Sequence, residues 1–500
     1  MERKSYGELS VFFLSVILLT CLILVPSQHV AYAEEDSQQA IERLTKTIEQ
    51  NPQDAEAYYQ RAEEYFLIDK YEEAIHDYSK VLELNPKHVA AYNNRGFAYA
   101  QAGYYDEAFA DYKQTIALDP ANAVAYRRYG LALNQRGQHE EALPLFDKAL
   151  ELDPEDGVSY FERGNAYFLL NKYEESSADY TKSLEFLPEH PNAWYYRGMS
   201  YFKLDKYEEA IRDYTQAQAL GIEAQDLYSE RGLAYQRTQQ YDQALQYLST
   251  VIAMQPDSSR AYTDRGFTYY DAKRYEEAIQ DFGKAIELEP KNATAFYFRG
   301  HSYRAVGQYK EAVDDYRAVE KLDPRWTERI IEEYSKVIEL DPQNIRAIFS
   351  RAESYNSLKR YEEALPDYTK VVEFAPNNAN AYYLRGMCQR RLKHYQEAIQ
   401  DFSKAIELDA QHTDAYKNRG DCYTILKQHA EAIEDYTTAI TLDPELIYAY
   451  YNRALTYEQL QQNEQAANDY NIYLKLRGDK DKDAGKISQK IRDLGFTPEF

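Results

Sequence analysis

The 500-residue sequence has little cysteine, few clustered basic residues and no tract rich in glycine and proline. Its three cysteines are too few for a disulfide framework. The formal net charge of −25 argues against a nucleic acid as partner, because phosphate contacts need clustered lysine and arginine. With 44% apolar and 28% charged residues and no low-complexity tract, the chain is predicted to fold.

Sequence motifs of catalytic and metal sites are missing as well. The nine histidines show no HExxH or other close spacing, so we expect no metal site. There is no GxxxxGK(S/T) phosphate loop and no GxSxG nucleophile elbow. Carboxylate pairs such as Glu72-Glu73 recur along the chain, which indicates solvated helix starts rather than a catalytic pair. We therefore predict a protein that is not an enzyme and uses no cofactor.

The N-terminal apolar run, Val11 to Val25, is shorter than the roughly 18–20 residues that span a bilayer comfortably. It follows Arg3 and Lys4 and precedes the small-residue triplet that ends at Ala33, a pattern typical of a signal peptide. We predict a signal peptide over 1–33, cleavage after Ala33, and a mature protein outside the cytoplasm, either periplasmic or secreted. The alternative is an uncleaved membrane anchor formed by Val11 to Val25.

Tyrosine is abundant, with 51 copies, which suggests a repeated structural position. When the chain is written in rows of 34 residues from Ala55, like residues align; eight rows fill 55–326 and four more fill 345–480. Position 4 of a row is aromatic in eleven of the twelve rows, and position 8 is glycine or alanine in all of them. Position 20 is alanine except for Ser176, position 24 is tyrosine or phenylalanine except for Leu248, and position 32 is proline in nine rows.

Each of these positions has a structural reason. Two helices of about 14 residues and a tight turn fill a row, and proline ends the second helix. Small residues allow the two helices to approach closely, and the aromatic residues fill the space around them. The row 259–292 shows the pattern as Tyr262, Gly266, Tyr269, Ala278, Phe282 and Pro290.

This order of residues resembles the tetratricopeptide repeat (TPR) family. The resemblance implies an all-α, right-handed superhelix, an α-solenoid of twelve full 34-residue hairpins plus two half-repeats. It also implies a concave groove lined by the first helices of the hairpins.

The 34-residue pattern is interrupted between 326 and 345. Residues 327–344 match only the second half of a row, and residues 38–54 do the same just before the first full row. We therefore predict two arrays that meet near 327; the alternative is a simple deletion absorbed by one superhelix. The predicted parts are a first array 34–326 (half-repeat 38–54, full repeats 55–326), a second array 327–480 (half-repeat 327–344, full repeats 345–480), and a C-terminal capping helix and tail 481–500, with Ile487 and Ile491 at helical spacing.

Ten rows carry arginine at position 7 and aspartate at position 23. In one row both residues change together, to Tyr129 and Leu145, which favours pairing within a row. We predict salt bridges between the two helices of a hairpin that fix its register and add little stability if they are exposed. The representative structural ion pairs are Arg61 with Asp77 and Arg265 with Asp281.

Cys388 and Cys422 occupy the same position in neighbouring rows. Equivalent points on stacked helices should lie on the order of 10 Å apart, too far for a disulfide. We therefore predict two free thiols.

The family resemblance assigns the groove to positions 2, 5, 9, 12 and 13 of each row. These positions are rich in aromatic residues, which predicts protein or peptide segments held by aromatic stacking and a few polar contacts. The alternative is a glycan, as for TPR proteins associated with exopolysaccharide export. The lysine–asparagine carboxylate clamp of some TPR domains is not reproduced, since Tyr59 and Glu63 stand at its first two positions. Arg304, Arg346, Arg390 and Arg391 are predicted to form a local basic group for an acidic segment. The remaining predicted groove residues are Tyr59, Phe66, Phe97, Phe161, Phe168, Tyr195, Phe202, Phe267, Tyr270, Tyr297, Phe349 and Tyr383.

Overall fold

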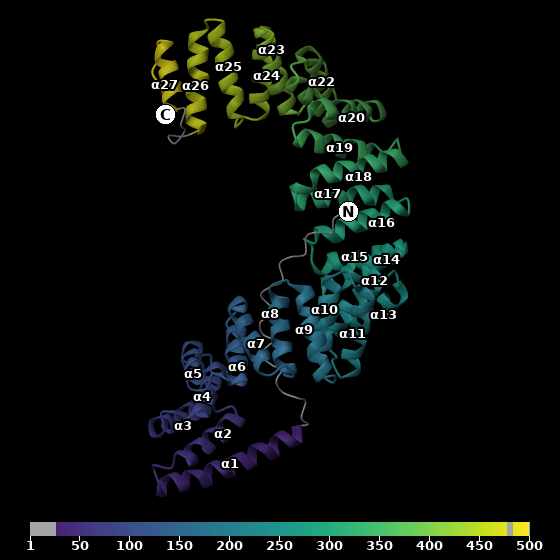
Figure 1. The fold of residues 1–500 in the computed structure, drawn as a ribbon. Helices are drawn as coiled ribbons and strands as arrows, with labels where there is room; N and C mark the ends of the chain where they lie inside the picture. The colour runs from purple at the N-terminus through teal and green to yellow at the C-terminus, as the bar shows by residue number, and fades with distance from the viewer. Residues whose placement is uncertain (1–26, 478–483, 500) are drawn as a thin grey trace. The chain divides into compact units, whose positions relative to one another are not determined.

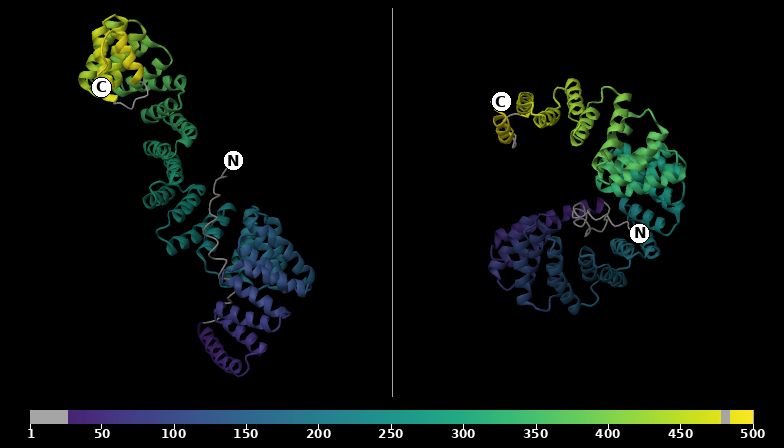
Figure 2. Two further views of the ribbon diagram at one scale, coloured as in Figure 1. Left: turned by 90° about the vertical axis from the view of Figure 1, so that its left-hand side faces the viewer. Right: turned by 90° about the horizontal axis from the view of Figure 1, so that it is seen from above.

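The computed structural model describes residues 27–477 and 484–499, and within these ranges the chain forms helices and no strand (Figure 1). The predicted all-α fold of helical hairpins is confirmed. The chain divides into two compact units, Met1–Pro256 and Asp257–Phe500. In both views of Figure 2, the helices of each unit follow one another hairpin by hairpin.

The first unit holds a lone helix followed by six hairpins. Its helices are α1 (Ser27–Gln50), α2 (Ala55–Leu67), α3 (Tyr71–Leu84), α4 (Val89–Gln101), α5 (Tyr105–Leu118), α6 (Ala123–Gln135), α7 (His139–Leu152), α8 (Gly157–Leu169), α9 (Tyr173–Phe186), α10 (Pro191–Lys203), α11 (Tyr207–Ala219), α12 (Gln225–Arg237) and α13 (Tyr241–Met254).

The second unit holds six further hairpins, a lone helix among them and a capping helix at its end. Its helices are α14 (Ser259–Asp271), α15 (Tyr275–Leu288), α16 (Ala293–Ala305), α17 (Tyr309–Leu322), the short 3-10 helix η3 (Pro324–Trp326), α18 (Thr327–Leu340), α19 (Ile345–Ser357), α20 (Tyr361–Phe374), α21 (Ala379–Arg391), α22 (Tyr395–Leu408), α23 (Thr413–Ile425), α24 (His429–Leu442), α25 (Ile447–Gln459), α26 (Asn463–Arg477) and α27 (Ala484–Asp493).

The first helix of each row has a defined start and a defined end. In nine of the twelve rows the side chain at position 34 of the preceding segment caps it; for instance, Asp54 accepts a hydrogen bond from the Ala57 backbone N–H, and His88 Nδ1 accepts one from Ala91. The residue at position 15, just past the end of the helix, has a left-handed backbone conformation with positive φ in all twelve rows, and in nine rows this residue is not glycine. This turn lets the second helix fold back antiparallel within two or three residues.

In most hairpins the core is an aromatic ring at position 24 that packs against a glycine at position 8. A Cβ atom built on Gly300 would lie 2.7 Å from Cε1 of Tyr316, and one built on Gly266 would lie 2.8 Å from the same atom of Phe282. Both rings are fully buried. Glycine is therefore required at position 8 of these rows because the ring at position 24 occupies the space that a Cβ would need.

The predicted arginine–aspartate pairs form within the row in all ten rows, each with two hydrogen bonds of 2.6–2.9 Å. In at least seven rows Nη1 of the arginine also donates to a side chain of the preceding second helix, as Arg95 does to Ser79 Oγ at 2.9 Å. The aspartate side chains are only 1–8% exposed and the arginines 13–20%. The pairs are thus largely buried, and where the third hydrogen bond forms they link three helices, which differs from weak pairs at an exposed surface.

The lone helix α18 begins where the predicted half-repeat 327–344 begins. Its Glu333 stands at the aspartate position but has no first helix of its own row to supply an arginine. The carboxylate is 3% exposed and lies 2.7 Å from Lys336 Nζ, 3.2 Å from His301 Nε2 and 3.4 Å from Arg304 Nη2. The predicted boundary near 327 lies inside the second unit, whereas the two units meet between α13 and α14. The division into arrays at 327 stays a prediction.

Two more segments bear on the predictions for the ends of the chain. In α27, Ile487 and Ile491 are buried against α26, in the place predicted for a C-terminal cap. Most of the predicted signal peptide, including Val11 to Val25, lies outside the described residues, and α1 runs through Ala33 without a break. Among the described helices, none has the length and apolar character needed to span a membrane.

The two cysteines of the repeats, Cys388 and Cys422, are buried and free, as predicted. Burial raises the pKa of each thiol to about 12. They are packing residues at the end of first helices and not reactive groups.

Candidate ligand-binding face

The aromatic side chains at position 5, which include six of the predicted groove residues, form a second layer over the core. Each packs on the aromatic side chain at position 24 of its own row, with ring centroids 5.7–6.2 Å apart. The layer consists of Tyr59, Phe161, Tyr195, Tyr297, Phe349, Tyr383 and Tyr451.

Three of these side chains are not open to a ligand. Tyr297 is 1% exposed, Phe161 6% and Tyr195 9%. The prediction that they line an open groove is therefore corrected. Tyr297 is covered by Trp326, at 4.9 Å between ring centroids, because η3 and α18 follow its hairpin directly.

The predicted aromatics at positions 9 and 12 are half-buried and contact their neighbours edge-on or tilted. Phe66 meets Phe97 of the next row at 5.0 Å, and Phe267 meets Phe298 at 4.6 Å. Four of them also contact the tyrosine five residues further on, at 5.3–5.6 Å. These four are Phe66, Phe168, Phe202 and Tyr270. Much of the aromatic surface counted in the sequence is therefore occupied by intramolecular contacts.

The predicted basic group in the second unit is largely neutralised by acids of the chain. Arg304 lies near Glu333, Arg346 bonds to Asp314, and Arg390 donates to Asp421 at 3.0 Å. Arg391 is exposed. The structure thus gives three of the four arginines a carboxylate within the protein, which weakens the prediction of an acidic partner at this place.

A different basic side chain, Arg128, is the better candidate. It lies on α6, at position 6 of its row, and its Nη1 donates a 2.8 Å hydrogen bond to Oδ1 of Asn94 on α4. Nδ2 of Asn94 donates in turn to the hydroxyl of Tyr59 on α2, also at 2.8 Å. One chain of hydrogen bonds therefore links the first helices of three successive rows.

The guanidinium of Arg128 is held by neutral groups. Its centre lies 4.6 Å from the ring centroid of Phe97. Among the residues that the structure describes, no carboxylate lies within 4.0 Å of its nitrogens, and its neighbour Arg127 is already paired with Asp156 at 2.8 Å. Burial lowers the pKa of Arg128 below its usual value, since the charge is removed from water without a counter-charge.

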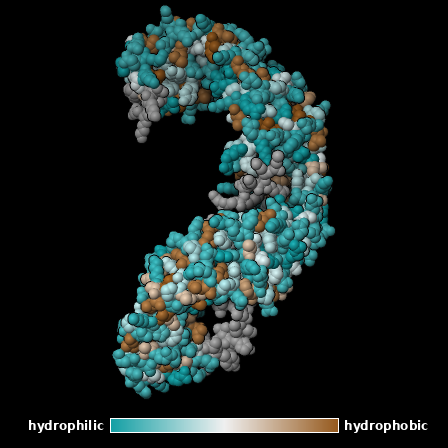
Figure 3. Space-filling view, viewed as in Figure 1, coloured by the Kyte–Doolittle hydropathy of each residue, from teal (hydrophilic) through white to brown (hydrophobic). Residues whose placement is uncertain are grey.

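Exposed aliphatic side chains occupy predicted groove positions in the row of Arg128 and in the next row. Val124 is 38% exposed, Val158 41% and Leu169 40%, and they belong to positions 2 and 13 of the rows. Figure 3 shows apolar residues only as small scattered patches on the face seen there. An isolated cation with an exposed valine one helical turn away, on a surface without a large apolar patch, suits one extended segment better than a large flat partner.

The next row carries an acid at the same position as Arg128. Glu162 on α8 is 9% exposed and accepts a 3.2 Å hydrogen bond from Asn165 Nδ2. Burial raises its pKa to about 7, which means that a large fraction is protonated at neutral pH. It therefore cannot act as a fixed counter-charge for Arg128.

Sequence reasoning missed Arg128 and Asn94 because position 6 was not assigned to the groove. Part of the signal was present in the sequence: position 6 is polar in nine of the twelve rows, and the first three carry the uncharged or basic residues Gln60, Asn94 and Arg128. The contact between rows, however, depends on how the hairpins stack, which one row does not show.

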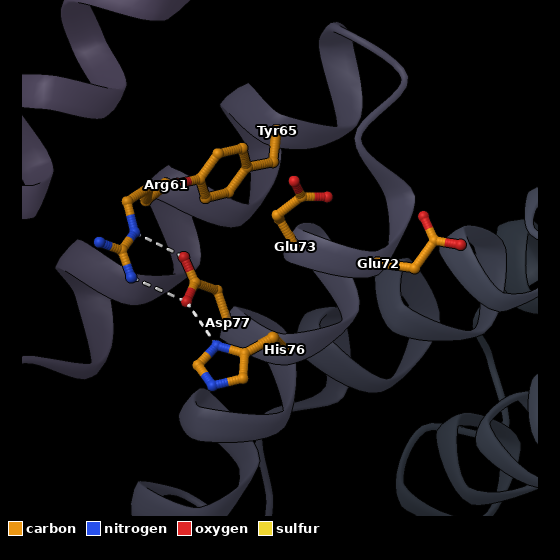
Figure 4. Close-up of a pocket in the computed structure, with 6 residues that line it drawn as sticks. All are labelled: Arg61, Tyr65, Glu72, Glu73, His76 and Asp77. Carbon is orange, nitrogen blue, oxygen red and sulfur yellow. Dashed lines mark hydrogen bonds and ion pairs between the residues drawn. The ribbon is translucent and has the colours of Figure 1, made fainter.

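A small hollow of about 260 Å³ lies between the two helices of the first hairpin, lined by Arg61, Tyr65, Glu72, Glu73, His76 and Asp77 (Figure 4). Its aspartate is held by Arg61 and also lies 3.2 Å from His76 Nδ1, while Glu72 points away from the pair. The hollow is an open space beside the arginine–aspartate pair of this row, and it brings no nucleophile and base together. In the described part of the chain, no cluster of histidine, cysteine, aspartate or glutamate is arranged to hold a metal ion.

Family models agree with this architecture. Models described as tetratricopeptide repeat match residues 55–88, 87–155, 232–296, 293–325, 345–378, 379–412, 413–446 and 447–480. A model for subunit 3 of the anaphase-promoting complex, or cyclosome, matches residues 135–216. No match was found among curated proteins.

Several solved structures are similar. YrrB, described as a TPR protein with an unusual peptide-binding site, is 27% identical over 36% of this chain and 92% of its own, with a TM-score of 0.33. MamA is 26% identical over 36% and 94%, with a TM-score of 0.30. The C-terminal part of a TPR protein from Cytophaga hutchinsonii is 20% identical over 51% and 97%, with a TM-score of 0.39.

TPR proteins are generally non-enzymatic scaffolds for protein–protein interaction. The matched models cover most of the sequence between 55 and 480, and the single-repeat matches coincide with observed hairpins. This chain therefore belongs to the tetratricopeptide repeat family.

Proposed function

We propose that the protein is a scaffold that binds an extended, acidic segment of another protein on the face formed by Tyr59, Asn94, Phe97, Arg128 and Val158. This surface is called the Arg128 face. The observation that carries the proposal is the guanidinium of Arg128, which is bonded to an amide and a ring and has no carboxylate partner within 4.0 Å in the described chain.

A ligand carboxylate would supply the missing counter-charge. Charge-assisted hydrogen bonds between a guanidinium and a carboxylate are about twice as strong as neutral ones. The bond from Arg128 to Asn94 holds the side chain in place beforehand, so that little side-chain entropy is lost on binding. Apolar side chains of the ligand would cover Val124 and Val158, at roughly 25 cal/mol per Å² of apolar area buried.

The test is the affinity of a fluorescent peptide with one central aspartate flanked by valine and leucine. Arg128→Gln should weaken binding about tenfold or more, because one charge-assisted contact is lost. The matched control is Arg237→Gln, which removes the same charge from an exposed position of the same unit. Equal affinities for both variants would contradict the proposal, as would unchanged binding of the peptide in which asparagine replaces aspartate.

The proposed place of action is outside the cytoplasm. This rests on the N-terminal pattern of Arg3, Lys4, the run Val11 to Val25, and Ala33. The intact mass of the protein purified after expression of the full gene tests it. A mature chain that starts at Glu34 supports export with cleavage, and a chain that retains the first 33 residues contradicts cleavage.

A further inference from the structure

The chain of hydrogen bonds that ends at Arg128 begins beside an acid. Tyr59, whose hydroxyl accepts the bond from Asn94, lies four residues before Glu63 on α2, so these two side chains share one face of that helix. Burial raises the pKa of the Tyr59 hydroxyl, and the nearby negative charge of Glu63 raises this pKa further. The carboxylate of Glu63 therefore lies at one end of the chain of hydrogen bonds and the guanidinium of Arg128 at the other.

Unlike the other acids at its position, Glu63 has no cation beside it. Position 9 holds an acid in three rows, namely Glu63, Glu353 and Asp421. Glu353 lies 3.2 Å from Arg317. Asp421 lies 2.9 Å from Lys417. Glu63 is exposed, and in the part of the chain that the structure describes no cation lies within 4.0 Å of its carboxylate. This carboxylate is therefore open to a positive group of a ligand.

The two unpaired charges are close enough for one ligand segment to contact both. Two hydrogen bonds of 2.8 Å and the width of the Asn94 amide place Nη1 of Arg128 within about 8 Å of the Tyr59 hydroxyl. Because Glu63 is next to that hydroxyl, its carboxylate lies within roughly 12 Å of the guanidinium. In an extended segment every second side chain points to the same side, about 6.6 Å apart, and the length of the two side chains covers the rest.

We propose that the Arg128 face selects a bipolar segment, in which a lysine or arginine lies two residues away from the acid and on the same side of the extended chain. The acid pairs with Arg128, the base pairs with Glu63, and the segment crosses α2, α4 and α6. This inference rests on the proposed function and adds a second charge to the ligand. A segment with a second acid in that place binds more weakly, because its negative charge meets Glu63.

The test measures the binding of three fluorescent peptides to the full chain at about 0.15 M salt. The first has the central aspartate flanked by valine and leucine, the second adds a lysine two residues before the aspartate, and the third adds it two residues after. Because Glu63 is exposed, its pair with the lysine should tighten binding about two- to fivefold in one of the two orders. The order that binds more tightly gives the direction in which the segment runs.

The variant Glu63→Gln should remove this gain. Its amide oxygen can still accept a bond from Tyr59, so the chain of hydrogen bonds to Arg128 is kept. The matched control is Glu73→Gln, which removes the same charge from an exposed position of α3 and should preserve the gain. A peptide with the lysine moved to its end measures the general attraction to a chain of net charge −25.

The outcomes separate this inference from the proposed function. A gain that Glu63→Gln removes and Glu73→Gln keeps supports the bipolar segment. No gain beyond that of the end-lysine peptide, or an equal loss of the gain in both variants, would overturn it, while Arg128-dependent binding of the aspartate peptide would still stand. Binding of the aspartate peptide that is unchanged in Arg128→Gln would overturn the proposed function and this inference with it.

Discussion

The buried ion pair of Arg385 and Asp401 allows a quantitative test of what holds the hairpins together. Its two hydrogen bonds are 2.7 and 2.6 Å long, and the side chains are 18% and 6% exposed. Arg385→Met would leave the Asp401 carboxylate buried without its cation. Removing one partner of a buried pair costs about 3–5 kcal/mol; because the arginine is partly exposed, we expect about 3 kcal/mol.

Replacing both partners should cost far less. The row with Tyr129 and Leu145 already lacks the pair and keeps the same hairpin. We therefore expect Arg385→Tyr with Asp401→Leu to cost about 1 kcal/mol, because no charge remains buried. The losses of stability in Arg385→Tyr alone and Asp401→Leu alone should add up to much more than the loss in the double variant.

Hydrogen exchange read by mass spectrometry is the suitable assay, because a repeat chain of this length need not unfold in one step. Amides of α21 and α22 report the local opening free energy, and those of α15 serve as an internal reference. If the costs of Asp401→Leu and Arg385→Tyr add up to that of the double variant within about 0.5 kcal/mol, the two residues are not coupled and the reasoning is refuted.

Three further predictions concern single positions. Gly300→Ala should lower the free energy of unfolding by about 1–3 kcal/mol, because its Cβ would lie 2.7 Å from the Tyr316 ring. Gly283→Ala, whose Cβ would have no atom closer than 3.7 Å, should raise the free energy of unfolding by up to about 1 kcal/mol. Changes of the same sign in urea unfolding of the two variants would contradict this. Lys393→Gly should raise the melting temperature by relieving a left-handed φ of 68°, while Gly307→Lys, at φ 79°, should lower it. The pKa of Glu162 is raised to about 7 from an ordinary value of 4.5, so the folded chain binds this proton more tightly than the unfolded chain does. The stabilisation that the bound proton provides is complete below about pH 4.5 and is lost as the pH rises through 7. Glu162→Gln should remove up to about 3 kcal/mol of this pH dependence between pH 5 and pH 8, and an unchanged dependence would show that the group ionises normally.

The period of 34 residues was enough to predict the hairpins. Alternating small and aromatic positions determine which faces of the two helices meet, and these are set within one row. The joint change at Tyr129 and Leu145 was enough to assign the ion pairs to their rows. Their burial was not predictable, because it depends on the preceding hairpin, which covers the arginine and accepts its third hydrogen bond.

The candidate site was predicted less well for a related physical reason. Position 5 aromatics such as Tyr297 face the groove by their place on the first helix, yet they are largely used to cover the ring at position 24. Arg128 gains its role only from Asn94 and Tyr59 in the two preceding rows. Contacts between rows, more than residue types within a row, decide which side chains of a TPR chain remain free to contact a ligand.

The absence of a first helix before α18 is another place where contacts between rows decide the outcome. The sequence showed a half-row, but not that Glu333 at its aspartate position pairs with Arg304 and Lys336 and lies 3.2 Å from His301 Nε2. Burial lowers the pKa of His301 to about 4, so the ring is neutral at pH 7, and the two other cations balance the acid. The fold thus absorbs a missing helix by providing new partners for the charge that it leaves behind.

The claim on which the account chiefly depends is that the first helices of the first unit carry the binding surface. Photo-crosslinking of the acidic peptide, with a benzophenone next to its aspartate, tests this most directly. We predict that the crosslinked tryptic fragments come from α4, α6 and α8, around Arg128, and that Arg128→Gln removes them. Crosslinks concentrated on the second helices α3, α5 and α7, or unaffected by the substitution, would contradict the account.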